Sequence, residues 1–116
     1  MFNTGIYNIT CYQGATYTET FTIKISDIAV NLTGYSAAMQ IRRSHEDATS
    51  VYTLVSGDGI TLGGAAGTIT LLIAYADTEL LEAGQYLYDL EITSSGGVKD
   101  RLLQGTFTVS SEITRV

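Results

Sequence analysis

The segment from Glu82 to Ile92 constrains the fold of this chain more than any other. A short helical pattern ends at Gly84, and an alternation with a period of two begins directly after it. One side of the alternation carries Tyr86, Tyr88, Leu90 and Ile92, and the other carries Asp89 and Glu91 after Gln85 and Leu87. Successive side chains of a β-strand point to opposite faces, so this period predicts a strand with an apolar inner face and an acidic outer face.

The same period of two recurs along the whole chain and predicts an all-β protein. Clear alternation covers residues 16–25, 37–42, 68–73, 86–92 and 103–109, and weaker strands cover residues 6–13, 51–55 and 60–62. Turn signals rich in Gly and Ser separate them, and residues 94–97 are the best hairpin candidate. We expect one domain over residues 1–116, an antiparallel β-sandwich of seven to eight strands, with residues 1–5 and 110–116 as extended arms.

One short helix is predicted between the strands at residues 68–73 and 86–92. Residues 77–83 begin with Asp77, a good N-cap residue, continue with an acidic first turn and stop at Gly84. In a sandwich, a segment at this position crosses from one sheet to the other.

The residues around Gly84 resemble the entry to the sixth strand of an immunoglobulin-type sandwich. Such strands often carry a tyrosine corner, in which a Tyr hydroxyl bonds to the backbone a few residues upstream. The usual pattern is Asp-x-Gly-x-Tyr-x-Cys, and this chain has Glu82, Gly84, Tyr86 and Tyr88 at those positions. The chain has no Trp and only one cysteine, Cys11, so an antibody-type disulfide core is excluded. Tyr86 is therefore either a corner tyrosine or, like Tyr88, an inward aromatic that buries a large apolar area.

Composition and charge narrow the classes of partner. The net charge of −6 disfavours binding to nucleic acid or to an anionic membrane, since both are negatively charged. Hydrophobic residues make up 45% of the chain, enough for a core, whereas charged residues make up only 16%, which suits a surface partly covered by a partner. No apolar run approaches the roughly 20 residues of a membrane helix. Without a secretion signal at the N-terminus, we expect the protein in a cytoplasm and Cys11 as a buried free thiol.

The residue types that carry chemistry are scattered along the chain. His45, the only histidine, lies in a polar connection where a solvated side chain is expected more than a catalytic base. Possible calcium ligands are Asp58, Asp77, Glu79 and Glu82, but they lack EF-hand spacing. The Gly-rich loops at residues 57–59 and 63–67 lack the lysine of a phosphate-binding loop. We therefore expect no catalytic residue, no metal, no cofactor and no small-molecule substrate, and no enzymatic activity.

Five segments together resemble small structural proteins of tailed bacteriophages, including the N-terminal domain of baseplate upper proteins. The segments are residues 13–17 (QGATY), 31–42 (NLTGYSAAMQIR), 67–71 (GTITL), 83–90 (AGQYLYDL) and 101–109 (RLLQGTFTV). The resemblance implies an immunoglobulin-like virion component without activity of its own. Baseplate proteins of this kind usually continue into a stalk, whereas this sequence ends at Val116, which leads us to expect a free-standing adaptor, collar or decoration subunit.

The resemblance and the absence of a catalytic set lead to one functional hypothesis with two alternatives. The hypothesis is a tail, baseplate or collar adaptor that binds other virion proteins, as a ring or multi-copy homo-oligomer assembled in the host cytoplasm. The alternatives are a capsid decoration protein and a module that binds carbohydrate or a host surface through exposed tyrosines, for which the candidates are Tyr7, Tyr12, Tyr52 and Tyr75. The side chains predicted to make assembly contacts are Arg42, Arg43, Asp89 and Glu91, with structural roles for Gly84, Tyr86 and Tyr88.

Overall fold

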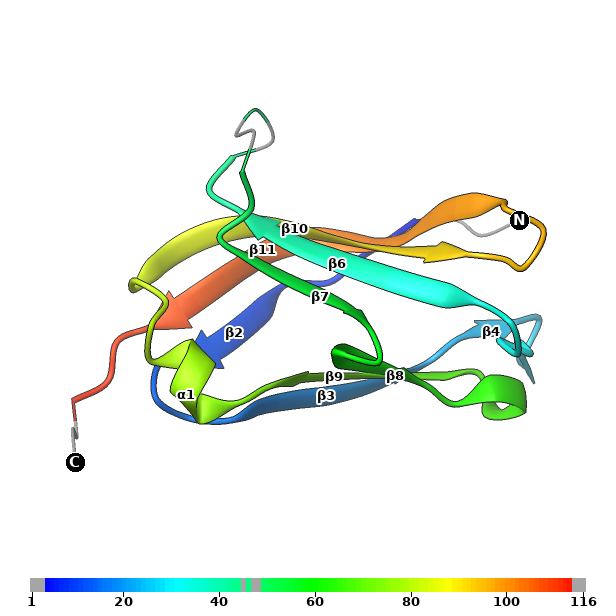
Figure 1. Cartoon of the computed structure of the whole chain (residues 1–116), viewed down its shortest axis with the longest axis horizontal. Coiled ribbons are helices and arrows are strands. Elements are labelled where there is room, and N and C mark those ends of the chain that lie inside the picture. The colour runs from blue at the N-terminus through cyan, green and yellow to red at the C-terminus, as the bar shows by residue number, and fades with distance from the viewer. Residues whose placement is uncertain (1–3, 45, 47–48, 114–116) are drawn as a thin grey trace.

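The strands form two packed layers that are continuous through one curled sheet (Figure 1). The computed structural model describes residues 4–44, 46 and 49–113. The first layer contains β1 (Gly5–Ile6), β2 (Ile9–Tyr12), β11 (Lys99–Ser110), β10 (Gly84–Thr93), β6 (Ser36–Arg42) and β7 (Tyr52–Ser56). The second layer contains β8 (Gly59–Leu62), β9 (Thr68–Ile73) and β3 (Tyr17–Thr22). The predicted all-β sandwich is confirmed.

The layers are joined by short connections. A tight turn at Gly57 and Asp58 carries the chain from β7 to β8, and the 3-10 helix η1 (Gly64–Ala66) leads into β9. Helix α1 (Tyr75–Thr78) crosses from β9 back to β10 in the first layer. The β10–β11 hairpin closes at residues 94–97, as the Gly and Ser signals predicted, with Ser94 bonded to Val98.

The core lies between the layers, and the sequence alternation matches it. On β10, β6 and β9 the apolar side is buried, and the other side is half-buried or exposed. The buried side chains form one cluster that extends from Ile9 to Val109, with Phe107, Met39 and Leu90 fully enclosed. Burial of these apolar faces is the main contribution to the stability of the fold.

Three details differ from the expectations. The pairings are not all antiparallel, because β1 and β2 run parallel to β11 and β7 runs parallel to β8. The strand predicted over residues 16–25 ends at Thr22, and a separate two-stranded sheet follows, β4 (Lys24–Ile25) with β5 (Ile28–Ala29). Counting such two-residue strands, the described part of the chain has eleven strands instead of seven or eight.

The predicted helix over residues 77–83 is shorter and lies earlier. Helix α1 begins after Ala74, which makes no side-chain cap, so Asp77 lies inside the helix and is not its N-cap. The Asp77 carboxylate instead accepts a hydrogen bond from the Tyr52 hydroxyl. After Thr78 the chain tightens into bonds between residues three apart, from Leu80 to Asp77 and from Leu81 to Thr78.

The first strand is interrupted where it crosses Gly105. A Cβ atom at Gly105 would lie 2.4 Å from the Tyr7 carbonyl oxygen, so only glycine lets the two backbones approach this closely. The residues on either side of the crossing pair with β11 as β1 and β2. Of the predicted arms, Gly5 belongs to β1 and Ser110 to β11, and residues 1–3 and 114–116 lie outside the described residues.

Candidate functional site

The side of β6, β10 and β11 that points away from the core is here called the outer face. It brings together most of the side chains predicted to make assembly contacts. Between these strands lies an open hollow of ≈ 270 Å³. Its lining consists of Gln40, Arg42, Ser44, Leu87, Tyr88, Asp89, Glu91, Arg101 and Gln104. Arg42 of β6 and the carboxylates Asp89 and Glu91 of β10 therefore share one surface, although the two strands are far apart in the sequence.

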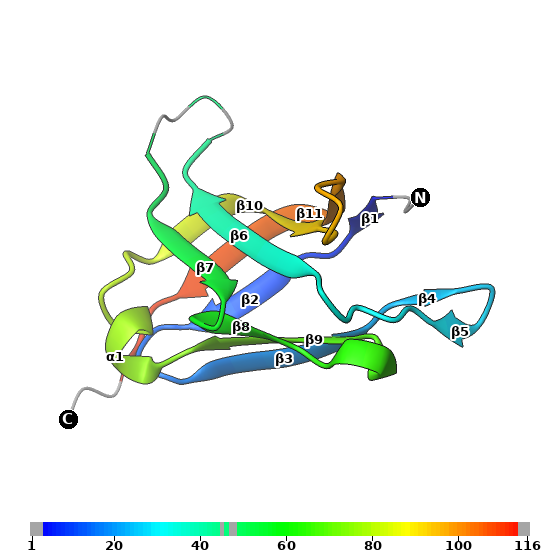
Figure 2. The same cartoon turned by 45° about the vertical axis from the view of Figure 1, so that its right-hand side comes forward.

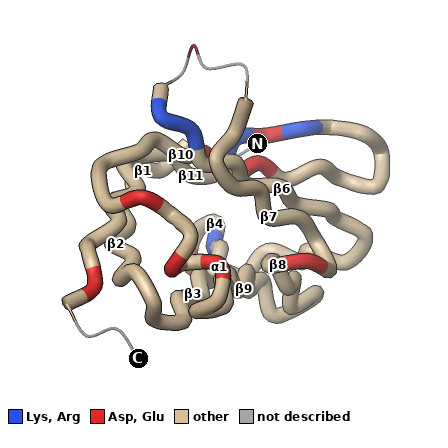
Figure 3. Tube along the Cα trace, turned by 60° about the vertical axis from the view of Figure 1, so that its left-hand side comes forward, with Lys and Arg blue, Asp and Glu red and all other residues tan. Residues whose placement is uncertain are grey.

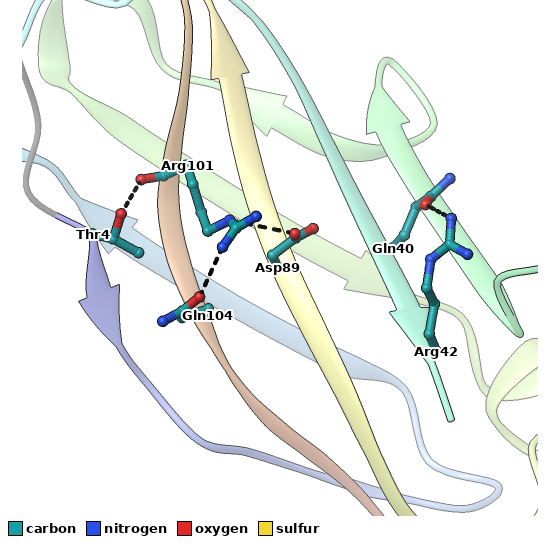
Figure 4. Close-up of polar contacts among 6 residues, drawn as sticks. All are labelled: Thr4, Gln40, Arg42, Asp89, Arg101 and Gln104. Atoms are coloured by element: carbon teal, nitrogen blue, oxygen red, sulfur yellow. Dashed lines mark hydrogen bonds and ion pairs between the residues drawn. The ribbon is translucent and has the colours of Figure 1, made fainter. Parts of the chain in front are cut away.

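Arg101 organises the centre of the outer face (Figure 4). Its guanidinium lies 3.5 Å from the Asp89 carboxylate and donates a 3.2 Å hydrogen bond to Gln104. The Thr4 hydroxyl donates to the Arg101 carbonyl oxygen, which holds the segment before β1 against β11. Both partners of the ion pair are substantially exposed, so it contributes little to stability and mainly fixes where the charges lie.

Two of the predicted arginines point to different places. Arg42 lines the hollow and donates a 2.6 Å hydrogen bond to Gln40. Arg43 leaves the hollow, forms an ion pair with Glu82 at 3.4 Å and lies over the ring of Tyr86, 5.3 Å from its centroid. The two arginines predicted to make assembly contacts are thus divided between the outer face and the connection before β10.

Arg101 is a member of the outer face that was not among the predicted contact residues. The register between β10 and β11 shifts after Leu90, so that Leu90 faces Leu103 and Glu91 faces Arg101. The additional residue, Leu102, turns inward and is buried. This bulge places Arg101 beside the acidic side of β10. No residue pattern in the sequence indicates the bulge.

The tyrosines of β10 make the contacts that a corner requires. The Tyr86 hydroxyl donates a 2.6 Å hydrogen bond to the carbonyl oxygen of Glu82, four residues upstream. Gly84 lies between them with a φ of 148°, a conformation that other residues rarely adopt. The Tyr88 hydroxyl donates to the Tyr7 carbonyl oxygen at 2.5 Å, beside Gly105, and burial raises the pKa of Tyr88.

A carboxylate on β3 that accepts hydrogen bonds from two tyrosines connects the second layer to the segment between β1 and β2. Glu19, the one polar residue on the apolar side of β3, accepts hydrogen bonds from the hydroxyls of Tyr7 and Tyr17. The bond to Glu19 raises the pKa of Tyr7, and burial followed by the same carboxylate raises the pKa of Tyr17. Tyr7 also packs edge-on against Phe21, with ring centroids 5.1 Å apart. This cluster fixes the crossing of the first strand onto β3.

The other residues considered for chemistry do not converge. His45 lies outside the described residues. Within residues 4–44, 46 and 49–113, no group of three His, Cys, Asp or Glu residues is placed to hold a metal ion, and no helix is long and apolar enough to cross a membrane. Cys11 is a free, fully buried thiol as predicted, and burial raises its pKa to about 11, so the reactive thiolate is disfavoured.

Comparison with known proteins identifies no family. No family model matches the chain, and no curated protein matches it. One similar solved structure comes from a photo-crosslinking study of multimeric cell-adhesive interactions of VGSC beta subunits. It has a TM-score of 0.46 and 14% sequence identity, and the match covers 94% of this chain and 93% of that one. This likeness carries no argument about function.

Proposed function

We propose that the chain is a non-enzymatic structural module that assembles through protein–protein contacts in the particle of a tailed bacteriophage. Its role is that of an adaptor in the tail, baseplate or collar. Two kinds of observation support the proposal. The five sequence segments resemble phage structural proteins, and the outer face has the character of a contact surface for another protein.

The outer face is the observation that carries the assembly role. Asp89 is held by Arg101, and Arg42 is held by Gln40, so the charged groups have defined positions before any partner arrives. A fixed pattern of both signs of charge favours one orientation of a partner, and pre-ordered side chains lose less entropy on binding. The hollow between these groups is open and polar and suits a protein surface with a complementary pattern of charge.

The composition of the particle tests the phage role. Particles produced from a genome that carries the gene for this chain are purified and digested, and their peptides are measured against those of the major capsid protein. We expect the chain in the particle, with far fewer copies than the capsid protein. A particle without the chain overturns the proposal, and a copy number close to that of the capsid protein replaces the tail role with shell decoration.

A matched pair of charge reversals tests the outer face. Glu91→Lys changes a carboxylate that borders the hollow, and Asp58→Lys makes the same change in the exposed turn between β7 and β8. We expect Glu91→Lys to lower incorporation of the protein into particles and Asp58→Lys to leave it unchanged. Equal incorporation of both variants would show that assembly does not use the outer face. Binding of the purified chain to a glycan array would favour the carbohydrate-binding alternative.

A further inference from the structure

The molecule measures 43 Å along its longest axis, and most of the large apolar side chains exposed in the described residues belong to segments at its two ends. Figure 1 shows which segments these are. One end contains α1, the end of β2 and the tail after β11, and is here called the α1 end. The other contains the β4–β5 hairpin and the β10–β11 turn, and is called the hairpin end. The α1 end exposes Tyr12, Tyr75, Leu80 and Ile113, and the hairpin end exposes Ile25, Ile28 and Val98. Single exposed apolar residues are ordinary, but groups of them mark contact sites.

The α1 end is one continuous surface because Gln13 ties its parts together. The Gln13 side chain donates to the Leu81 carbonyl at 2.8 Å and accepts the Glu112 N–H at 3.1 Å. Its backbone N–H donates to Ser110. The turn after β2, the segment after α1 and the C-terminal tail are thereby held side by side, with Leu80, 79% exposed, standing out from them.

The hairpin end is a projection. Strands β4 and β5 pair only with each other, and the hairpin extends away from the sandwich (Figure 2). Ile25 and Ile28 are paired residues on either side of the two-residue turn of this hairpin, and Ile28 is 72% exposed. This shape presents two apolar side chains to a neighbouring molecule.

The two ends also differ in charge. The α1 end carries four carboxylates, Asp77, Glu79, Glu82 and Glu112, of which Arg43 pairs with Glu82. Figure 3 shows these acidic segments around α1. The hairpin end carries Lys24 and Lys99 together with Asp27 and Asp100, so its formal charges balance, and Lys24 directly precedes the exposed Ile25 in β4. Two α1 ends would repel each other, whereas a hairpin end has no net charge to repel an α1 end and offers Lys24 to its carboxylates.

We propose that the chain binds a second copy of itself head to tail, with the hairpin end of one molecule on the α1 end of the next. Ile25 and Ile28 then pack against Tyr75 and Leu80, and Lys24 faces the carboxylates of the α1 end. A head-to-tail contact leaves one free end of each kind, so it continues into a ring or a filament. The inference deepens the assembly role proposed above and rests on it only for the premise that the chain assembles.

Single substitutions at each end test the contact on the purified chain. Leu80→Glu and Ile28→Glu each place a charge in the centre of one end, and Val55→Glu places the same charge on an exposed valine of β7 outside both ends. Sedimentation velocity over a range of concentrations measures self-association. We expect the wild type and Val55→Glu to associate alike, and each end variant to associate about tenfold or more weakly. Circular dichroism confirms that the exposed sites leave the fold intact.

Mixing the two end variants distinguishes head-to-tail binding from symmetric pairing. Leu80→Glu keeps an intact hairpin end and Ile28→Glu keeps an intact α1 end, so an equal mixture should form dimers and nothing larger. A wild type that stays monomeric, an association that only one of the variants disrupts, or a mixture without dimers would each overturn the inference. A chain that is monomeric in solution but present in particles would overturn this inference alone and leave the proposed function standing.

Discussion

The α1 end and the hairpin end expose similar apolar side chains, but the segments that carry these side chains are tied to the rest of the molecule to different extents. At the α1 end, Thr78 and Gln13 join three segments through hydrogen bonds, so the exposed residues stand on a braced surface. At the hairpin end, β4 and β5 are paired only with each other, and both turn residues, Ser26 and Asp27, have positive φ. The difference implies that changes to the buried or hydrogen-bonded residues that brace the α1 end affect folding, whereas changes at the hairpin end affect mainly the hairpin itself and what it contacts.

Alkaline pH should give the largest loss of stability, and it should act through tyrosines that lie outside the hairpin end. Tyr7, Tyr17, Tyr52 and Tyr88 have pKa values raised above the usual 10.0, and none of them belongs to the hairpin end. Burial and the Asp77 carboxylate raise the pKa of Tyr52 to about 12. A pKa raised by folding contributes stability that is complete below the unfolded pKa and is lost as pH rises through the folded pKa.

We therefore expect the urea midpoint to be constant from neutral pH to about pH 9, where the Cys11 thiol begins to titrate in the unfolded chain, and to fall steadily as the tyrosines follow and pH rises toward about 12. Tyr52→Phe removes one of these hydroxyls and should make the fall shallower. An exposed tyrosine supplies the control, since Tyr12→Phe should leave the slope unchanged. A midpoint that does not vary over this interval would contradict the prediction.

Thr78→Val should give the next largest effect, at the point that braces the α1 end. The Thr78 side chain is fully buried, and its hydroxyl lies 2.9 Å from the Ala15 carbonyl and accepts the Gly14 N–H at 3.1 Å. Valine keeps the shape and leaves both backbone groups without this partner, at a cost of about 2 kcal/mol in the free energy of unfolding. Urea denaturation followed by circular dichroism measures it. The exposed Thr18→Val is the control, and equal effects of the two would show that the brace is unimportant.

Tyr86→Phe should cost less, about 1 kcal/mol, because only one hydrogen bond is lost. The ring remains in the core and under Arg43, and the Glu82 carbonyl belongs to an exposed residue that water can solvate. The same denaturation measurement checks it. A loss well above this value would mean that the corner holds the crossover from α1 to β10 more strongly than one hydrogen bond can, and a loss near zero would make Tyr86 a purely apolar core residue.

The sequence predicted those parts of the molecule whose signals are local. Alternation and Gly84 are enough to place β10, and the Ser and Gly residues at 94–97 are enough to place its hairpin with β11. The tyrosine corner was one of the two alternatives predicted for Tyr86. It could be predicted because the carbonyl group that accepts the hydroxyl lies only four residues upstream.

The parts that the sequence did not predict depend on distant partners or on unusual backbone conformations. Arg101 joins the outer face through a bulge in the pairing of two strands, and Thr78 and Gln13 act on segments more than sixty residues away in sequence. The β4–β5 turn was hidden because Ser26 and Asp27 adopt positive φ without glycine. A pattern of residue types carries none of this information, since it reflects the local period and not the register.

The smallest expected effect is a gain in stability at the hairpin end. Two-residue turns with positive φ at both positions favour glycine or asparagine, and Asp27 has a φ of 64°. Asp27→Gly removes this strain and should stabilise the hairpin by about 0.5 kcal/mol, partly offset by the greater freedom of glycine in the unfolded chain. Slower amide hydrogen exchange in β4 and β5 would show it, with little change in the urea midpoint. Asp27→Ala should act in the opposite direction, because alanine tolerates positive φ less well than aspartate. Faster exchange in Asp27→Gly would mean that the hairpin conformation is held by something other than its turn.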